Sequence, residues 1–183
     1  EVLTAQIDSG TTTSTSSRLS FAQERLWFIE SYEGGSNAYN ISSITKLANS
    51  VDITIFEQAI RATVLRHDVL HSLIKMDNDG NGYQEVINLE LQPLVINTEL
   101  LSTNEDLCNR VKLDVNHIFK LDQEYPIRMS IYELKHNFSQ IKYQAALETK
   151  DLSEYYISII VHHVAFDGWS IDVFLSVLIQ HYD

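Results

Sequence analysis

The stretch that decides the fold is "YYISIIVHHVAFDGWSIDVFLSVLIQHY", residues 155–182. It begins with β-branched and aromatic residues typical of a buried strand, and it ends in an apolar periodicity typical of a helix. Between the two, His162 and His163 are followed by Asp167 and Gly168. The pattern predicts a strand, a turn and a helix, with two imidazoles and a carboxylate close to the point where the strand ends.

The rest of the chain alternates between strand and helix patterns. Ser20 and Asp52 are predicted N-caps, and Gly34 with Gly35 is predicted to end the first helix. We expect helices within 19–32, 51–70, 102–119 and 168–182, and strands within 39–47, 71–76, 83–88, 125–134 and 155–164. The polar stretch 135–154 is predicted either to extend a hairpin or to form a surface loop. This order favours an α/β (α+β) fold with helices packed on a mixed, mostly antiparallel sheet.

Length and composition limit the class of protein. The chain has 183 residues and is 44% hydrophobic, which is enough for one globular unit. Its 13 basic and 25 acidic residues give a formal net charge of −12, which argues against binding nucleic acid or an anionic membrane surface. Cys108 is the single cysteine and cannot form an internal disulfide. With no signal peptide or membrane-length apolar run, we expect a cytoplasmic protein.

The two ends of the sequence suggest a larger parent. Residues 8–17, "DSGTTTSTSS", have the composition of a flexible linker, so we divide the chain into a linker over 1–18 and a folded unit over 19–183. The chain starts without Met and stops within a helical pattern. We therefore expect it to be a fragment of a longer protein.

The double histidine has a plain interpretation and a functional one. A lone histidine in an apolar segment usually serves the core or the surface, and an aspartate before a helix is usually a cap. On a strand, however, neighbouring side chains face opposite sides. One of His162 and His163 is therefore predicted to face the core, and the other to face a cavity. Two imidazoles interrupting a buried strand cost desolvation unless at least one is used or well paired. The combination therefore indicates a site.

Three chemistries can be compared for this site. A metal centre is disfavoured because the two rings diverge and no second ligand cluster follows. A serine triad is disfavoured because no G-x-S-x-G elbow occurs. A single histidine acting as a general base needs only a neutral imidazole, whose reference pKa is about 6.5, and access for a substrate. The residues favour the third chemistry.

At this point the chain resembles a known family, the condensation domains of nonribosomal peptide synthetases, within the chloramphenicol-acetyltransferase-like acyltransferases. "LSFAQERLWFIE", residues 19–30, is similar to the family's opening S-x-A-Q-x-R-L-W signature. "RHDVLHSLI", residues 66–74, is similar to R-H-E-x-L-R-T, and "HHVAFDGWS", residues 162–170, to H-H-x-x-x-D-G. Weaker similarity extends over residues 118–134. The resemblance implies the N-terminal lobe of such a domain, with the C-terminal lobe absent.

The resemblance implies a reaction and a set of partners. A donor acyl or peptidyl thioester arrives on the phosphopantetheine arm of an upstream carrier domain, and an acceptor amine arrives on a downstream one. No cofactor or metal is expected to bind this lobe directly, and an adenylation domain is expected nearby. His163 is expected to orient or deprotonate the amine or to stabilise the tetrahedral intermediate, with His162 behind it. Asp167 is expected to keep the turn in shape, and Gly168 to lie where the acceptor arm passes.

One position departs from the family pattern. The arginine that usually pairs with the motif aspartate is replaced here by His71. Because a buried, unpaired carboxylate is costly, we expect a basic group within hydrogen-bonding reach of Asp167. Arg66, Arg128 and a protonated His71 are the candidates.

Two other functions remain open at this point. An epimerisation domain shares the fold and the double histidine, although the opening signature fits condensation better. A catalytically silent lobe that recruits a partner protein is the non-enzymatic alternative. An intact H-H-x-x-x-D-G argues against the second, because a binding module gains nothing from a positioned base. The parent protein is expected to be an amide-forming acyltransferase, and the fragment alone is expected to be inactive.

Overall fold

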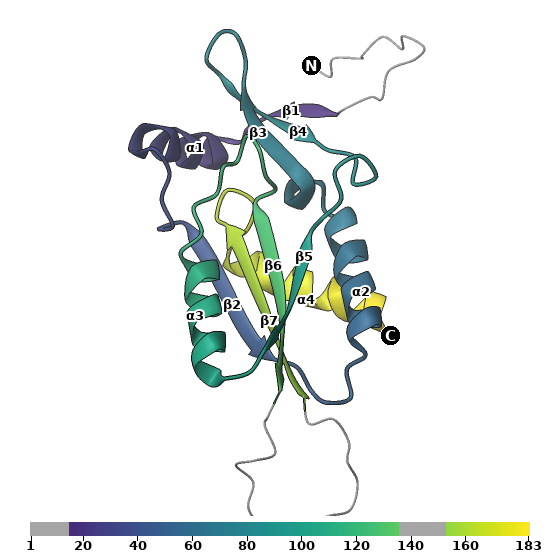
Figure 1. The fold of residues 1–183 in the computed structure, drawn as a ribbon. Coiled ribbons are helices and arrows are strands. Elements are labelled where there is room, and N and C mark those ends of the chain that lie inside the picture. Colours follow the sequence, from purple (N-terminus) through teal and green to yellow (C-terminus); the bar gives the residue numbers. More distant parts are fainter. Residues whose placement is uncertain (1–14, 136–152) are drawn as a thin grey trace, which may run out of the picture.

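The computed structural model describes residues 15–135 and 153–183, and its strands form two sheets (Figure 1). The larger sheet contains, in spatial order, β2 (Asn40–Lys46), β7 (Ser153–His162), β6 (Ile127–Lys135) and β5 (Ile96–Leu101). The smaller sheet contains β1 (Ser16–Arg18), β4 (Gly82–Val86) and β3 (Ser72–Met76). β7 is an inner strand of the larger sheet, so the double histidine lies at the end of an inner strand and not of an edge strand.

Each predicted helix is present, although the second and third end four or five residues before the predicted bounds. The helices are α1 (Phe21–Glu33), α2 (Ile53–Leu65), a short 3-10 helix η1 (Asp68–His71), α3 (Asn104–Val115) and α4 (Gly168–Tyr182). Ser20 caps α1 in a reciprocal box with Gln23, and Asp52 caps α2. Gly34 ends α1 in the left-handed region at φ 76°, which glycine adopts without a steric penalty. The predicted caps are therefore confirmed.

The main core lies between the larger sheet and the pair of helices α2 and α4. Ile60 on α2, Phe174 and Leu178 on α4, and Met129 and Ile131 on β6 are all buried in it. Because side chains alternate along a strand, the neighbours of Met129 and Ile131 face the opposite side, where α3 covers the sheet (Figure 1). The sheet is thus covered by helices on both faces.

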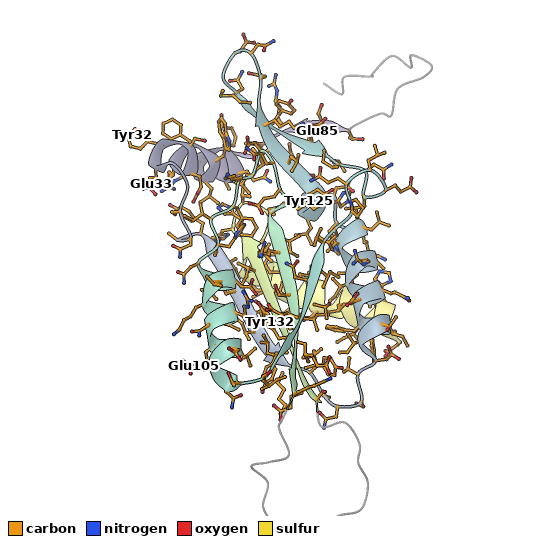
Figure 2. The ribbon with its side chains drawn as sticks, viewed as in Figure 1. Tyr32, Glu33, Glu85, Glu105, Tyr125 and Tyr132 are labelled. Atoms are coloured by element: carbon orange, nitrogen blue, oxygen red, sulfur yellow. The ribbon has the colours of Figure 1, made fainter. Side chains whose placement is uncertain are left out.

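A buried carboxylate fastens α3 to the sheet. Asp114 accepts hydrogen bonds from the Tyr132 hydroxyl at 2.6 Å, the Ser130 hydroxyl at 3.3 Å and Nε of Arg128 at 3.5 Å. Tyr132, labelled in Figure 2, is itself buried, and burial together with this bond raises its pKa to about 12. The hydroxyl therefore remains a donor to Asp114 over the whole physiological pH range.

The expected fold class is confirmed, and two details differ. β5 was not anticipated; it pairs in parallel with β6, and α3 supplies the long crossover that a parallel pair requires. Ser16–Arg18, the last residues of the expected linker, form β1 and pair with β4, so an ordered strand begins before residue 19. The rest of the linker and the expected loop over 136–152 lie outside the described residues. Within the part described, no helix is long and apolar enough to cross a bilayer.

Candidate functional site

The candidate site is the turn that joins β7 to α4. The backbone carbonyl of His162 accepts a hydrogen bond from the amide of Ala165 at 3.0 Å, which closes a turn immediately after the strand. The amide of His163 donates to the carbonyl of Tyr39 at 2.8 Å, so the start of β2 holds the turn from the neighbouring strand. His163 therefore lies at the first position beyond the sheet.

The two histidines have opposite environments, as the strand geometry predicts. His162 is completely buried, whereas His163 is exposed. The ring of His162 lies against Phe119, with the two centroids 5.9 Å apart in an edge-on arrangement. One imidazole thus belongs to the core, and the other can meet a molecule from outside.

The ring of His163 is held through a single nitrogen. Its Nδ1 lies 2.7 Å from the backbone carbonyl oxygen of Phe166. A carbonyl oxygen can only accept, so Nδ1 carries the proton in this hydrogen bond. In the neutral ring, Nε2 then holds the lone pair. The hydrogen bond to Phe166 therefore does not involve Nε2, the nitrogen that can accept a proton.

The ring of His162 is held in the other tautomer. Its Nδ1 accepts a hydrogen bond from the backbone amide of Val164 at 3.1 Å. A backbone amide can only donate, so the proton of the neutral ring lies on Nε2. This nitrogen is 3.6 Å from Oε1 of Glu30, a buried carboxylate near the end of α1. Burial lowers the pKa of His162, and the negative charge of Glu30 opposes that effect only in part.

This environment makes the stability of the chain sensitive to acid. Unfolded His162 takes up a proton below its reference pKa of about 6.5, whereas folded His162 resists it, so the unfolded state binds more protons. The free energy of unfolding should fall as pH decreases from that value towards the lowered pKa of the folded state, by at most about 1.4 kcal/mol per pH unit. In urea denaturation between pH 8 and pH 5, the free energy of unfolding should depend less steeply on pH in His162→Asn than in the wild type. The side-chain oxygen of asparagine can still accept the hydrogen bond from the Val164 amide. Equal slopes for this variant and the wild type would contradict the assignment, and His181→Asn, which removes an exposed imidazole, is the matched control.

Asp167 caps α4 and forms no ion pair with any described residue. Its Oδ1 accepts hydrogen bonds from the amide of Ser170 at 2.9 Å and from the hydroxyl of Ser170 at 2.6 Å. The bond from the Ser170 hydroxyl is the main cause that lowers the pKa of this carboxyl group. The side chain is exposed, and the structure shows no Lys, Arg or His within ion-pair distance of it among residues 15–135 and 153–183.

The expectation of a basic partner for Asp167 was therefore wrong. Water solvates an exposed carboxylate, and a helix N-terminus stabilises it further, so no cation is needed. The three candidate bases are placed elsewhere. Arg128 binds Asp114, the ring of His71 lies between the Ile87 carbonyl and Asp68, and Arg66 is exposed at the end of α2.

Gly168 is the first residue of α4, and its backbone does not require glycine. The described glycines with positive φ are Gly34, Gly35 and Gly80, so Gly168 is not required to relieve a left-handed turn. A Cβ atom added at Gly168 would meet no other atom within 4 Å. The backbone here therefore borders open space.

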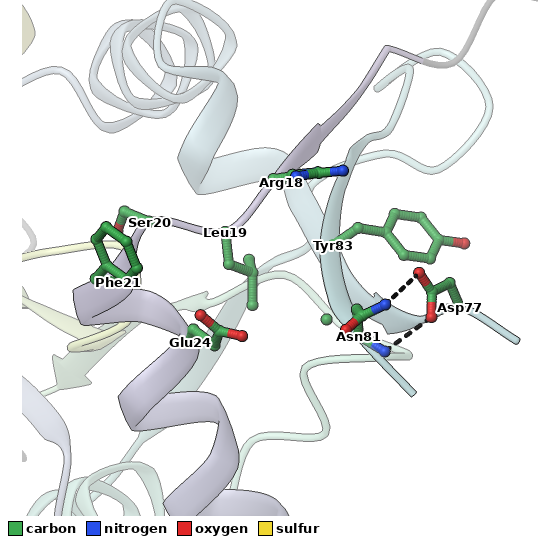
Figure 3. A pocket seen from close by; sticks show the side chains of 9 residues that line it. Arg18, Leu19, Ser20, Phe21, Glu24, Asp77, Asn81 and Tyr83 are labelled. Atoms are coloured by element: carbon green, nitrogen blue, oxygen red, sulfur yellow. Dashed lines mark hydrogen bonds between the residues drawn. The ribbon is translucent and has the colours of Figure 1, made fainter. Parts of the chain in front are cut away.

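One pocket adjoins the turn, and another lies away from it. One of about 310 Å³ is lined by Asp167, Trp169 and Ser170 from the start of α4 and by His67 and Val69 from the segment after α2. Another, of about 530 Å³, lies between the start of α1 and the β3–β4 hairpin, and no residue of the H-H-x-x-x-D-G motif lines it (Figure 3). The first is continuous with the candidate site, and the second is separate from it.

Two residues make contacts near the turn that the sequence did not predict. The side-chain amide of Gln23 donates to the carbonyl of Val164 at 3.2 Å, and Glu30 faces His162. Gln23 belongs to the opening signature, which marked it without indicating its contact. Glu30 carries no local signal, because a glutamate near the end of a helix is usually exposed.

Comparison with known proteins connects this geometry to a family. The condensation-domain family matches residues 14–183. The chain is 35% identical over 159 residues to N-(5-amino-5-carboxypentanoyl)-L-cysteinyl-D-valine synthase of Penicillium rubens, which covers 85% of the chain and 4% of the synthase. It is 29% identical over 154 residues to a dimodular nonribosomal peptide synthase of Bacillus subtilis, covering 84% of the chain and 6% of that protein. The chain thus spans a small part of the relatives it matches.

Solved structures agree on the fold. The starter condensation domain of rhizomide synthetase RzmA superimposes with a TM-score of 0.71 at 17% identity, covering 92% of this chain and 39% of that one. The first condensation domain of the calcium-dependent antibiotic synthetase, in complex with a substrate analogue, gives 0.70 at 19% identity and covers 90% and 36%. Through its sequence match over residues 14–183, and with the same fold, the chain belongs to the condensation-domain family of nonribosomal peptide synthetases.

Proposed function

We propose that this chain supplies the histidine-bearing part of a domain that forms an amide bond between two tethered substrates. The donor is an acyl or peptidyl thioester on one carrier domain, and the acceptor is an amine on another. Both arrive on phosphopantetheine arms, so the chain itself needs no bound cofactor. The observation that carries the proposal is the exposed ring of His163, whose Nδ1 is engaged by the Phe166 carbonyl and whose Nε2 is left to accept a proton.

The proposed step balances in atoms and charge. The amine nitrogen attacks the thioester carbonyl carbon, and the new C–N bond forms as the C–S bond breaks. Nε2 of His163 accepts the proton that the nitrogen loses and returns it to the departing thiolate, which leaves as a free thiol. A positioned base of this kind contributes roughly 10²- to 10⁴-fold to the rate. Holding two tethered substrates in register contributes through proximity.

The other expected partners enter as part of the same proposal. Carrier domains would deliver the two arms, a second lobe would complete the domain, and an adenylation domain would activate the amino acid. The synthetase names of the relatives support this arrangement, because such proteins assemble peptides from carrier-bound units. The pocket beside Asp167 and the open space at Gly168 are compatible with an arm approaching His163 along the start of α4.

The test is a single-turnover reaction of the full-length protein. Its carrier domains are loaded with a panel of aminoacyl groups by a phosphopantetheinyl transferase, and the arms are analysed by intact-protein mass spectrometry. Transfer of the donor mass to the acceptor arm, with loss of the donor thioester, is the expected result. Inversion at the α-carbon leaves the mass unchanged, so it is detected by chiral chromatography of the amino acid released from the arm. Inversion without transfer would contradict the proposal and favour epimerisation. Binding of a partner protein with no transfer for any loaded pair would favour a recruiting lobe.

A further inference from the structure

Helix α1 lies beside the turn that carries His163 and contacts it at two places. Near its start, the side-chain amide nitrogen of Gln23 donates to the carbonyl of Val164 at 3.2 Å. Near its end, Oε1 of Glu30 lies 3.6 Å from Nε2 of His162. Val164 and His162 are the residues directly after and before His163. The helix therefore contacts the backbone of the residue after the exposed imidazole and the side chain of the residue before it.

We infer that Gln23 and Glu30 are positioning residues for His163, each acting through one of its chain neighbours. The inference rests on the proposed function, since it assigns a purpose to the orientation of that ring. It explains why α1 carries two polar side chains directed at the turn.

The side-chain amide of Gln23 forms hydrogen bonds through both its oxygen and its nitrogen. Its Oε1 accepts from the backbone amide of Ser20 at 3.0 Å, which completes the capping box of α1. Its Nε2 donates to Val164 and also to Oε1 of Gln84 on β4 at 3.2 Å. One side chain thus ties the start of α1, the smaller sheet and the turn together. Removing only the donor would release the turn and leave the helix cap in place.

The contact of Glu30 is fixed by its own partners. Its Oε2 accepts from the amide of Ser36 at 3.0 Å, and its Oε1 accepts from the hydroxyl of Ser36 at 3.3 Å. The carboxylate is therefore held in place behind His162, on the side where that ring carries its proton. Since Nδ1 of His162 accepts from the amide of Val164, an orientation imposed on this ring is passed to the residue after His163.

The decisive variant is Gln23→Glu. A carboxylate can still accept from the Ser20 amide, and an acidic side chain at this position of a helix is favourable, so the fold should be kept. It cannot donate to Val164, and its negative charge repels the carbonyl there. In the full-length protein we expect kcat for amide formation to fall by between about tenfold and a hundredfold, with KM within about twofold of wild type, because the ring is misplaced while the carriers still bind.

Three comparisons make the result interpretable. Gln84→Ala removes the other acceptor of Gln23 and should leave kcat near wild type. Glu30→Gln, which removes the charge facing His162, should lower kcat in the same way as Gln23→Glu, whereas Glu33→Gln, which removes an exposed charge from the same helix, should change it little. Hydrogen exchange of the amides of His163 and Ala165, followed by mass spectrometry, should be faster in Gln23→Glu and unchanged in Gln84→Ala.

The outcomes separate this inference from the function on which it depends. If His163→Ala leaves amide formation unchanged, the role proposed for His163 in that reaction fails. If His163→Ala blocks the reaction but Gln23→Glu alters neither kcat nor exchange at the turn, the positioning role alone is overturned. The positioning role would also be overturned if kcat fell only in proportion to a fall in the melting temperature. A general loss of folded protein would then explain the lower kcat.

Discussion

Replacing His163 with alanine should lower the rate constant for amide formation in the full-length protein by roughly 10²- to 10⁴-fold. The ring is exposed and held through Nδ1 by the Phe166 carbonyl, so its Nε2 is the group that can accept the proton of the attacking amine. Because the ring lies outside the core, its removal should leave the fold intact. Single-turnover transfer from a loaded donor arm to a loaded acceptor arm, followed by mass spectrometry, measures the effect.

A second histidine variant provides the control for this prediction. His181→Ala removes an exposed imidazole near the end of α4 and should leave the transfer rate unchanged. Binding of the carrier domains should be the same in both variants. If His163→Ala transfers the acyl group at the wild-type rate, proton transfer by this ring is not part of the reaction. Positioning of the two arms would then have to account for the rate.

The second large effect is on stability. Asp114→Ala should lower the free energy of unfolding by about 3 kcal/mol, because the buried donors that converge on the carboxylate lose their acceptor. The Tyr132 hydroxyl, at 2.6 Å, is the closest of them, and Tyr132 itself is buried. The carboxylate also joins α3 to β6, so its loss should weaken the packing of that helix. Urea denaturation followed by circular dichroism measures the change.

A double-mutant cycle tests whether the network is the cause. In Asp114→Ala, Tyr132→Phe removes a hydroxyl that no longer has a partner, so the double variant should be less destabilised than the sum of the two single variants. Glu105→Ala removes an exposed acidic side chain from the same helix and should stay within about 0.5 kcal/mol of wild type. A loss in Asp114→Ala no larger than in Glu105→Ala would show that the buried network contributes little.

Local patterns in the sequence predicted the elements that carry the site. The β-branched run before His162 forms β7, and the amphipathic run after Asp167 forms α4 with the expected bounds. The two-residue period of a strand was enough to predict that His162 and His163 have opposite environments, and the structure confirms it. These features depend on chain neighbours, so a single sequence contains them.

Other features depend on residues far apart in the chain and were missed or misjudged. β5 lies at the edge of the sheet, and its short apolar pattern did not distinguish it from a loop. Asp167 was expected to be buried beside a base, but its depth depends on how α4 sits on the sheet. Glu30 is buried, and its carboxylate lies 3.6 Å from the ring of His162, a residue far from it in the chain.

The amino-acid sequence by itself therefore determined the strand, the turn, the helix cap and the chemistry of an imidazole at the strand exit, because each depends on short-range periodicity and backbone hydrogen bonding. Only the tertiary structure decided which side chains of α1 reach the turn, and that the carboxylate of Asp167 faces water. These contacts join residues up to 141 positions apart, as between Gln23 and Val164. Burial and distance at that separation follow from packing, which no local pattern encodes.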